Sequence, residues 1–120
     1  MECYCDFEPA KVYQADVHVA RKQHKCDECH RTISSGERYE RVFGIWDEPR
    51  TYKTCARCLA LREFVTAHVP CTCWTHGNMI DDCMEEAYEY AHEAPGLMFG
   101  AYRLKVLIRR SAKFTKSAAA

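Results

Sequence analysis

The sequence predicts a small α+β domain. The first observation behind this prediction is a set of two Cys-x-x-Cys pairs in one short chain, Cys26 with Cys29 and Cys55 with Cys58. The second is that apolar residues alternate in several stretches before the second pair, as they do in strands. The third is that apolar residues recur at helical spacing after the second pair. Strands followed by helices, with the cysteine pairs between them, indicate this fold class.

The two cysteine pairs predict a structural zinc site. Four thiolates presented on two tight turns are the ligand set of a tetrahedral structural zinc ion. Residues 30–54 are long enough to form a hairpin that brings the second pair back to the first. We therefore expect one zinc ion, held by Cys26, Cys29, Cys55 and Cys58.

The first expected strand lies before the first cysteine pair. Residues 10–20 alternate between apolar and polar positions. This period places Tyr13, Ala15, Val17 and Val19 on one face of the strand.

A hairpin is expected between the cysteine pairs. Residues 38–46 form its first strand, with Tyr39 and Phe43 on one face. Residues 47–50 form a turn, where a proline costs no ladder hydrogen bond. Residues 51–54 return as the partner strand and lead into the second cysteine pair.

The first helix is expected from about residue 57, so that it carries the last thiolates in its first turn. The partial positive charge of a helix N-terminus favours negative thiolates at that place. Pro70 ends the helix. Its expected apolar stripe is Leu61, Phe64, Val65 and His68.

Two further helices are expected in the C-terminal part. Asn78 is a suitable N-cap for the first, with Asp81 and Asp82 in its favourable first turn. The Pro95-Gly96 pair stops that helix. Residues 97–114 fit both a strand period and a helical period, and we interpret them as a helix.

These elements predict one domain overall, in two parts. Residues 1–76 form a zinc-binding module with an N-terminal strand, and residues 77–120 form a helical part packed on it. A turn that carries a Cys-x-x-Cys pair is called a knuckle. The order of a knuckle at Cys26 and Cys29, a hairpin and then a helix is that of a treble-clef finger. The chain is thus expected to be treble-clef-like.

The cysteine pairs and their surroundings carry a resemblance. The segments 24–29 (HKCDEC), 33–39 (ISSGERY) and 52–58 (YKTCARC) resemble treble-clef and zinc-ribbon-like domains. More narrowly, they resemble small zinc-binding proteins of bacteriophages and prophages, over roughly residues 20–83. The resemblance implies an accessory protein of a mobile element that binds and modulates a host protein machine, such as a nucleic-acid-handling or defence complex.

The remaining cysteines leave two interpretations open. Cys3, Cys5, Cys71 and Cys73 form two Cys-x-Cys pairs that flank the finger and could bind a second zinc ion, with His76 or Cys83 as substitute ligands. The other interpretation is that they are partly buried thiols, which pack as small apolar side chains. Cys83 lies on the apolar stripe of its helix, which favours core packing for that residue.

Catalysis is not expected. A site closed by four cysteines leaves no coordination position for a substrate. Treble-clef nucleases carry histidines on the hairpin, and residues 31–54 contain none. The Pro-Cys-x-Cys at residues 70–73 is one spacer short of the zinc-deaminase pattern.

Balanced net charge hides two oppositely charged segments, because residues 81–93 are acidic and residues 103–116 are basic. The simplest interpretation is two solvated helix faces that partly neutralise each other. Alternatively, the acidic helix docks on a basic protein surface, or the basic end contacts the phosphates of a nucleic acid. The candidate partner-binding residues are Asp81, Asp82, Glu85, Glu86, Tyr88 and Glu89, with Arg109 and Arg110 in the basic segment.

The composition favours a cytoplasmic protein, in the bacterial host cytosol if it is phage-encoded. The chain has 17 basic and 17 acidic residues, so no overall field attracts it to a membrane or to nucleic acid. Nine cysteines is an odd number, which a complete disulfide framework does not use. Acidic residues follow Met1 where a secretory signal would have basic ones, and no apolar run could span a bilayer. We expect a monomer or homodimer with a protein partner, or with nucleic acid as the alternative.

Overall fold

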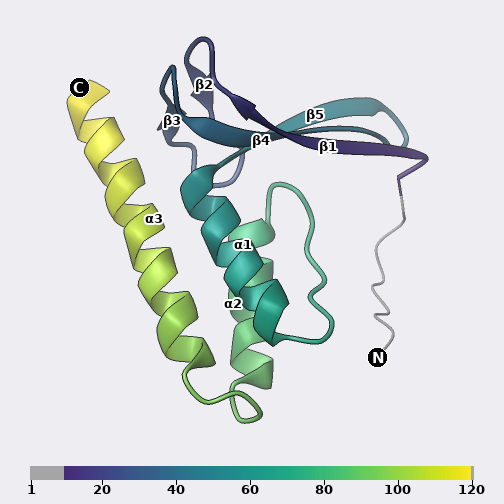
Figure 1. Ribbon diagram of the computed structural model, residues 1–120, viewed down its shortest axis with the longest axis vertical. Coiled ribbons are helices and arrows are strands. Elements are labelled where there is room, and N and C mark those ends of the chain that lie inside the picture. Colours follow the sequence, from purple (N-terminus) through teal and green to yellow (C-terminus); the bar gives the residue numbers. More distant parts are fainter. Residues whose placement is uncertain (1–9, 120) are drawn as a thin grey trace.

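The computed structural model describes residues 10–119 of the chain, with side chains for residues 10–110. It is an α+β structure, as predicted, in which strands precede helices (Figure 1). The strands are β1 (Val12–Val19), β2 (His24–Lys25), β3 (Thr32–Ile33), β4 (Arg38–Ile45) and β5 (Pro49–Cys55). The helices are α1 (Ala56–His68), α2 (Met79–Tyr90) and α3 (Leu97–Ala119).

The main sheet has three antiparallel strands in the order β1-β4-β5. Strand β4 is central, and residues 39–45 of it pair with both neighbours; Arg41, for example, pairs with Asp16 and Lys53. Side chains of directly paired residues lie on the same face of a sheet, and successive residues alternate between faces. This alternation confirms that Tyr13, Ala15, Val17 and Val19 share one face.

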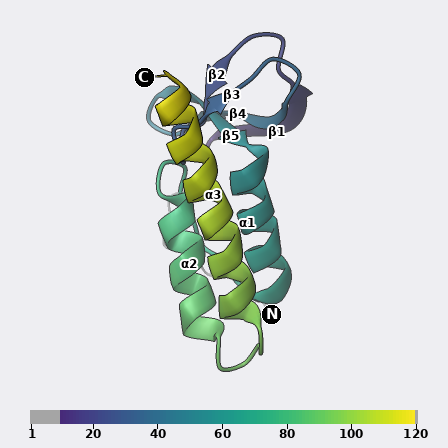
Figure 2. The ribbon, with the colours of Figure 1, turned by 90° about the vertical axis from the view of Figure 1, so that its left-hand side faces the viewer.

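All three helices lie on one side of the sheet in two perpendicular views (Figures 1 and 2). We call the sheet face toward them the inner face and the opposite one the outer face. Glu40 and Val42 belong to the inner face, because Glu40 bonds to Arg62 of α1. Arg41 and Phe43 therefore belong to the outer face.

The core lies where the three helices meet beneath the sheet. Helix α1 packs against α2 and α3, and these two also pack against each other. The approach of α3 to α1 is close at Gly100, where an added Cβ would overlap the ring of Phe64. Among the helix residues up to 110, whose side chains are described, those buried are Cys58, Leu61 and Val65 on α1, Met79, Cys83 and Ala87 on α2, and Leu97, Ala101 and Ile108 on α3.

The structure resolves one ambiguity of the sequence and corrects one expectation. Residues 97–114 are helical, and α3 continues to Ala119. His68, by contrast, is exposed rather than part of the buried stripe, and its Nδ1 lies 2.7 Å from the carbonyl oxygen of Phe64. The helix ends at His68, and Val69, in extended conformation just after it, is the buried residue instead.

Candidate metal centre

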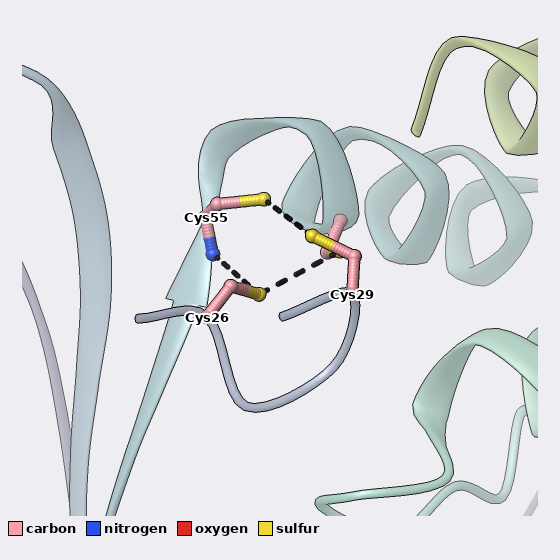
Figure 3. A group of neighbouring side chains, drawn as sticks. Cys26, Cys29 and Cys55 are labelled. Atoms are coloured by element: carbon pink, nitrogen blue, oxygen red, sulfur yellow. Dashed lines mark hydrogen bonds between the residues drawn. The ribbon is translucent and has the colours of Figure 1, made fainter. Parts of the chain in front are cut away.

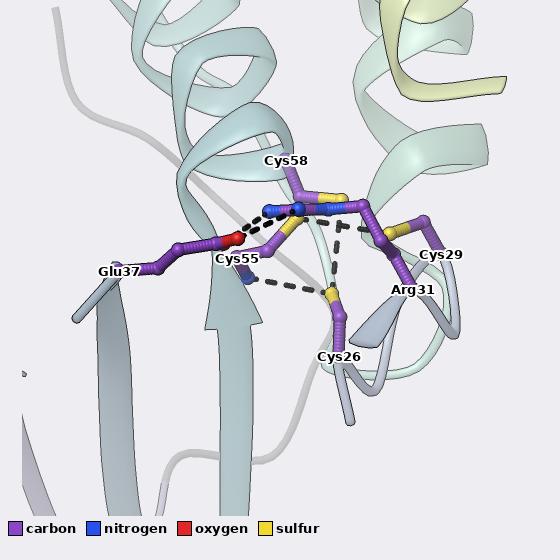
Figure 4. A network of polar contacts seen from close by, with 6 residues as sticks. All are labelled: Cys26, Cys29, Arg31, Glu37, Cys55 and Cys58. Carbon is purple, nitrogen blue, oxygen red and sulfur yellow. Dashed lines mark hydrogen bonds and ion pairs between the residues drawn. The ribbon is translucent and has the colours of Figure 1, made fainter. Parts of the chain in front are cut away.

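The four cysteines of the two Cys-x-x-Cys pairs lie together, as predicted (Figures 3 and 4). Their Sγ atoms are all within 4.8 Å of one another. The Cys26–Cys58 separation is 3.8 Å and the Cys29–Cys55 separation is 3.7 Å. A zinc–sulfur bond of about 2.3 Å corresponds to a tetrahedron edge of about 3.8 Å. These two separations therefore match opposite edges of a zinc-tetrathiolate tetrahedron.

The first knuckle is a tight turn wrapped around the sulfur of Cys26. The backbone N–H groups of Glu28 and Cys55 both point at that sulfur, with donor–acceptor distances of 3.4 Å. The turn closes with a hydrogen bond from the backbone N–H of His30 to the carbonyl oxygen of Cys26. His30 has a φ of 63°, the left-handed conformation that such a turn requires.

The second knuckle joins a strand to a helix. Cys55 is the last residue of β5, and Cys58 lies in the first turn of α1. This places both thiols at the positive end of a helix, where negative charge is stabilised. The cluster is also shielded from water, because Cys26, Cys55 and Cys58 are fully buried.

The thiols shift each other's acidity. The hydrogen bond with Cys29 lowers the pKa of Cys26 to about 7, and the pKa of Cys55 is lowered further, mainly by its hydrogen bond with Cys26. The pKa values of Cys29 and Cys58 are raised, again mainly by the hydrogen bond with Cys26. Only part of the cluster can therefore ionise by itself. A divalent cation removes this restriction, because a coordinated thiol is deprotonated.

Arg31 supplies a positive charge beside the thiols. Its guanidinium extends across the cluster and meets Glu37 (Figure 4). The nearest pair of atoms in this ion pair, Nη2 and Oε2, lies 2.9 Å apart. A zinc ion with four thiolates carries a net charge of −2, which Arg31 partly offsets. The sequence offered only a weak signal for this role, namely an arginine placed two residues after the knuckle.

Glu28, inside the first knuckle, connects the cysteine cluster to α2. Its carboxylate accepts hydrogen bonds from the backbone N–H of Gly77, at 2.7 and 2.8 Å, and from that of Met79, at 3.0 Å. These N–H groups lie at the start of α2, where they have no partner within the helix. Burial raises the pKa of Glu28, and the two backbone bonds oppose that rise. The knuckle therefore positions α2 as well as the metal ligands.

A buried ion pair joins the inner face of the sheet to α1. Arg62 donates two hydrogen bonds to Glu40, at 2.8 and 2.6 Å. The side chains of Arg62 and Glu40 are only 14% and 11% exposed. The guanidinium also lies over the ring of Trp74, 4.9 Å from its centre. Sequence reasoning did not identify this pair.

His76 is held in an aromatic cluster beside that pair. Its ring stacks on Tyr52, with ring centres 4.5 Å apart, and Trp74 meets it edge-on at 4.8 Å. The hydroxyl of Tyr13 lies 3.1 Å from Nε2. Burial lowers the pKa of His76 to about 4, so the ring is neutral near pH 7. The stacking assigns His76 a packing role that holds the 69–78 loop against the sheet.

The remaining cysteines divide into three groups. Cys71 and Cys73 lie in the loop before α2, with their Sγ atoms 3.7 Å apart. Cys3 and Cys5 lie outside the described residues. Cys83 is fully buried in α2, and burial raises its pKa to about 12, so it is a packing residue as predicted.

The acidic residues of α2 separate into two faces. Asp82 is engaged within the chain and accepts hydrogen bonds from the backbone N–H of Thr75, at 2.9 Å, and from Nδ2 of Asn78, at 2.8 Å. Glu86 accepts one from the backbone N–H of Cys73. The exposed face carries Asp81, Glu85, Tyr88 and Glu89, which we call the α2 stripe.

The basic segment lies next to that helix on α3. Arg109 and Arg110 are both exposed. Arg109 and Lys105 line the same cleft as Asp81 and Glu28, so opposite charges of α2 and α3 face each other there. This arrangement agrees with the simplest interpretation of the two charged segments.

None of the helices in the described part of the chain combines the length and apolar character needed to cross a membrane. No protein-family profile, curated protein or solved structure matches the chain.

Proposed function

We propose that the chain is a non-catalytic interaction module of treble-clef type, stabilised by one structural zinc ion. The observation that carries the proposal is the cluster of four thiols, whose Sγ atoms all lie within 4.8 Å of one another and three of which are fully buried. A zinc ion with four thiolates has no open position for substrate or water. The metal then serves the fold, and function resides on the surfaces that the fold presents.

The partner we propose is a protein with a basic surface. The α2 stripe supports this, because three carboxylates and a tyrosine that is 74% exposed share one face of the helix. Carboxylates aligned on a rigid helix complement a basic surface and steer its approach. The resemblance to small phage zinc proteins extends the proposal to a mobile-element accessory protein acting on a host machine in the bacterial cytoplasm.

Neutralising the α2 stripe tests the proposed partner. When the tagged wild-type chain is isolated from a bacterial lysate, we expect its partner protein to co-purify with it. The variant D81N/E85Q/E89Q is expected to lose that partner, as measured by quantifying the bound proteins. Three surface ion pairs of about 0.5–1 kcal/mol each sum to about 2 kcal/mol, a roughly 30-fold loss of affinity. The matched control removes three exposed carboxylates elsewhere, in the variant D47N/E48Q/E63Q. Equal retention of the partner by both variants would show that the stripe is not the interface.

A second zinc ion is the finer part of the proposal. We propose that Cys71 and Cys73, which are disulfide-bonded in the structure, hold it together with Cys3 and Cys5 in the reduced chain, because the 3.7 Å separation of the Cys71 and Cys73 sulfurs is again a zinc-tetrathiolate edge. Native mass spectrometry of protein purified without chelators is expected to find two zinc ions per chain. The variant C71S/C73S is expected to retain one. The second site would be contradicted if the wild-type chain carried only one zinc ion and its mass were lower than that of the fully reduced chain. Such a loss of mass would show that the remaining cysteines form disulfides instead of binding metal.

A further inference from the structure

We infer that the outer face of the sheet binds single-stranded nucleic acid, with cations for the phosphates and an exposed aromatic ring for a base. This inference goes beyond the protein-binding role proposed above and uses a different surface. It rests on the proposed function only in requiring the zinc-stabilised fold. The site consists of Arg41 and Lys53 with their neighbours, next to a hollow beside Phe43.

The register of the sheet places the main cations side by side. Arg41 of β4 pairs directly with Lys53 of β5, and both belong to the outer face. Like charges directly opposite each other destabilise a sheet. The ammonium of Lys53 also donates a hydrogen bond to Nδ1 of His24, 3.1 Å away, which holds the lysine in place. The pairing of Arg41 with Lys53 thus keeps two positive charges side by side at a cost to the fold.

The neighbouring side chains do not neutralise the positive charges of Arg41 and Lys53. Within the described side chains, no carboxylate lies within ion-pair distance of Arg41 or Lys53. The nearby carboxylate of Asp27 accepts from the backbone N–H of Lys53 instead. A bound phosphate would supply the missing counter-charge.

An aromatic ring lies beside the cations. Phe43 follows Arg41 by two residues on β4, so it shares the outer face, and it is 37% exposed. A hollow of about 350 Å³ adjoins it, lined by Gln14, Asp16, His18, Arg41 and Phe43. Bases of single strands stack on exposed aromatic rings while cations follow the backbone. The carboxylate of Asp16, which pairs with Arg41 across the strands, can accept from a base amino group.

The shape of the surface favours a single strand over the alternatives. A base can stack on Phe43 only when it has left its own duplex stack. The outer face presents strands rather than a helix that could enter a major groove. An acidic peptide would satisfy the cations, but it would leave the ring and the amino-accepting Asp16 without a role.

The test is fluorescence anisotropy with labelled twelve-residue oligocytidylates, one of DNA and one of RNA, titrated with zinc-loaded protein at several salt concentrations. Phe43→Ala is expected to weaken binding by about tenfold, within the range measured for one stacked base. Removing both cations in R41Q/K53Q is expected to reduce the slope of log affinity against log salt by about 1.4, since each phosphate contact on a single strand contributes about 0.7.

The matched control removes two exposed cations away from the outer face, Arg50 and Arg57, in the variant R50Q/R57Q. Its affinity and its salt slope are expected to stay within twofold of the wild type. If this variant weakens binding as much as R41Q/K53Q, the outer face is not the site. If a labelled oligoglutamate binds as tightly as the oligonucleotides, and Phe43→Ala changes neither, the surface recognises acidic protein and the inference is wrong.

Zinc content and circular dichroism of every variant separate this inference from the proposed function. A wild-type chain without zinc would contradict the proposed function itself. A zinc-loaded, folded wild-type chain that binds neither oligonucleotide at low salt would contradict only the inference about the outer face.

Discussion

Replacing Cys58 with serine is expected to abolish zinc binding at the cluster of Cys26, Cys29, Cys55 and Cys58 and to leave the chain without a cooperative unfolding transition. Cys58 is fully buried, and its sulfur lies 3.8 Å from that of Cys26. Structural zinc ions contribute about 10–16 kcal/mol of apparent binding free energy at neutral pH. Folded domains are stable by only about 5–15 kcal/mol in total. Loss of the metal therefore removes as much free energy as the whole fold retains.

The matched control for this variant is Cys83→Ala. Cys83 is as buried as Cys58, but it lies in α2, outside the cluster of four thiols. We expect the control to keep its zinc and to lose about 1 kcal/mol of stability, the typical effect of a point mutation. Native mass spectrometry counts the metal, and thermal melting followed by circular dichroism measures the fold. A chain with Cys58→Ser that melts like the control would contradict a metal-dependent fold.

Features set by local spacing could be predicted from the sequence. The x-x spacing brings two sulfurs of one turn together, and a hairpin between the pairs joins the two turns; both are visible as residue patterns. The helices follow from apolar periodicity in the same way, including α3, where two periods competed. In that segment the pairing with α1, close at Gly100, agrees with the helical period.

Contacts between distant segments could not be predicted, because no period encodes them. Glu28 meets Gly77 across 49 positions, and Arg62 meets Glu40 across 22. Each partner is an ordinary charged or small residue until the fold brings the two together. The same limit applies to Asp82, which in sequence is one of a run of acids but in the structure holds the 69–78 loop. The outer-face cations Arg41 and Lys53 likewise come from two separate strands.

Replacing Arg62 with methionine is expected to destabilise the chain by about 3–5 kcal/mol, the effect of leaving one partner of a buried ion pair uncompensated. Glu40 would keep its charge on the inner face, where its side chain is 11% exposed. It would lose both hydrogen bonds from the guanidinium, and Trp74 would lose the cation over its ring. Chemical denaturation with constant zinc measures the loss as a shift of the midpoint.

Replacing Glu40 as well separates the desolvated charge from the contacts that are lost. In the double variant E40Q/R62M no charge remains buried, so part of the stability is expected to return. Apolar or neutral replacements of a complete buried pair are often close to neutral. The double variant should therefore be more stable than Arg62→Met alone, with a coupling free energy of about 1–3 kcal/mol. If the effects of the two replacements simply add, the pair does not couple the sheet to α1, and the position of α1 depends on the cysteine cluster and on core packing.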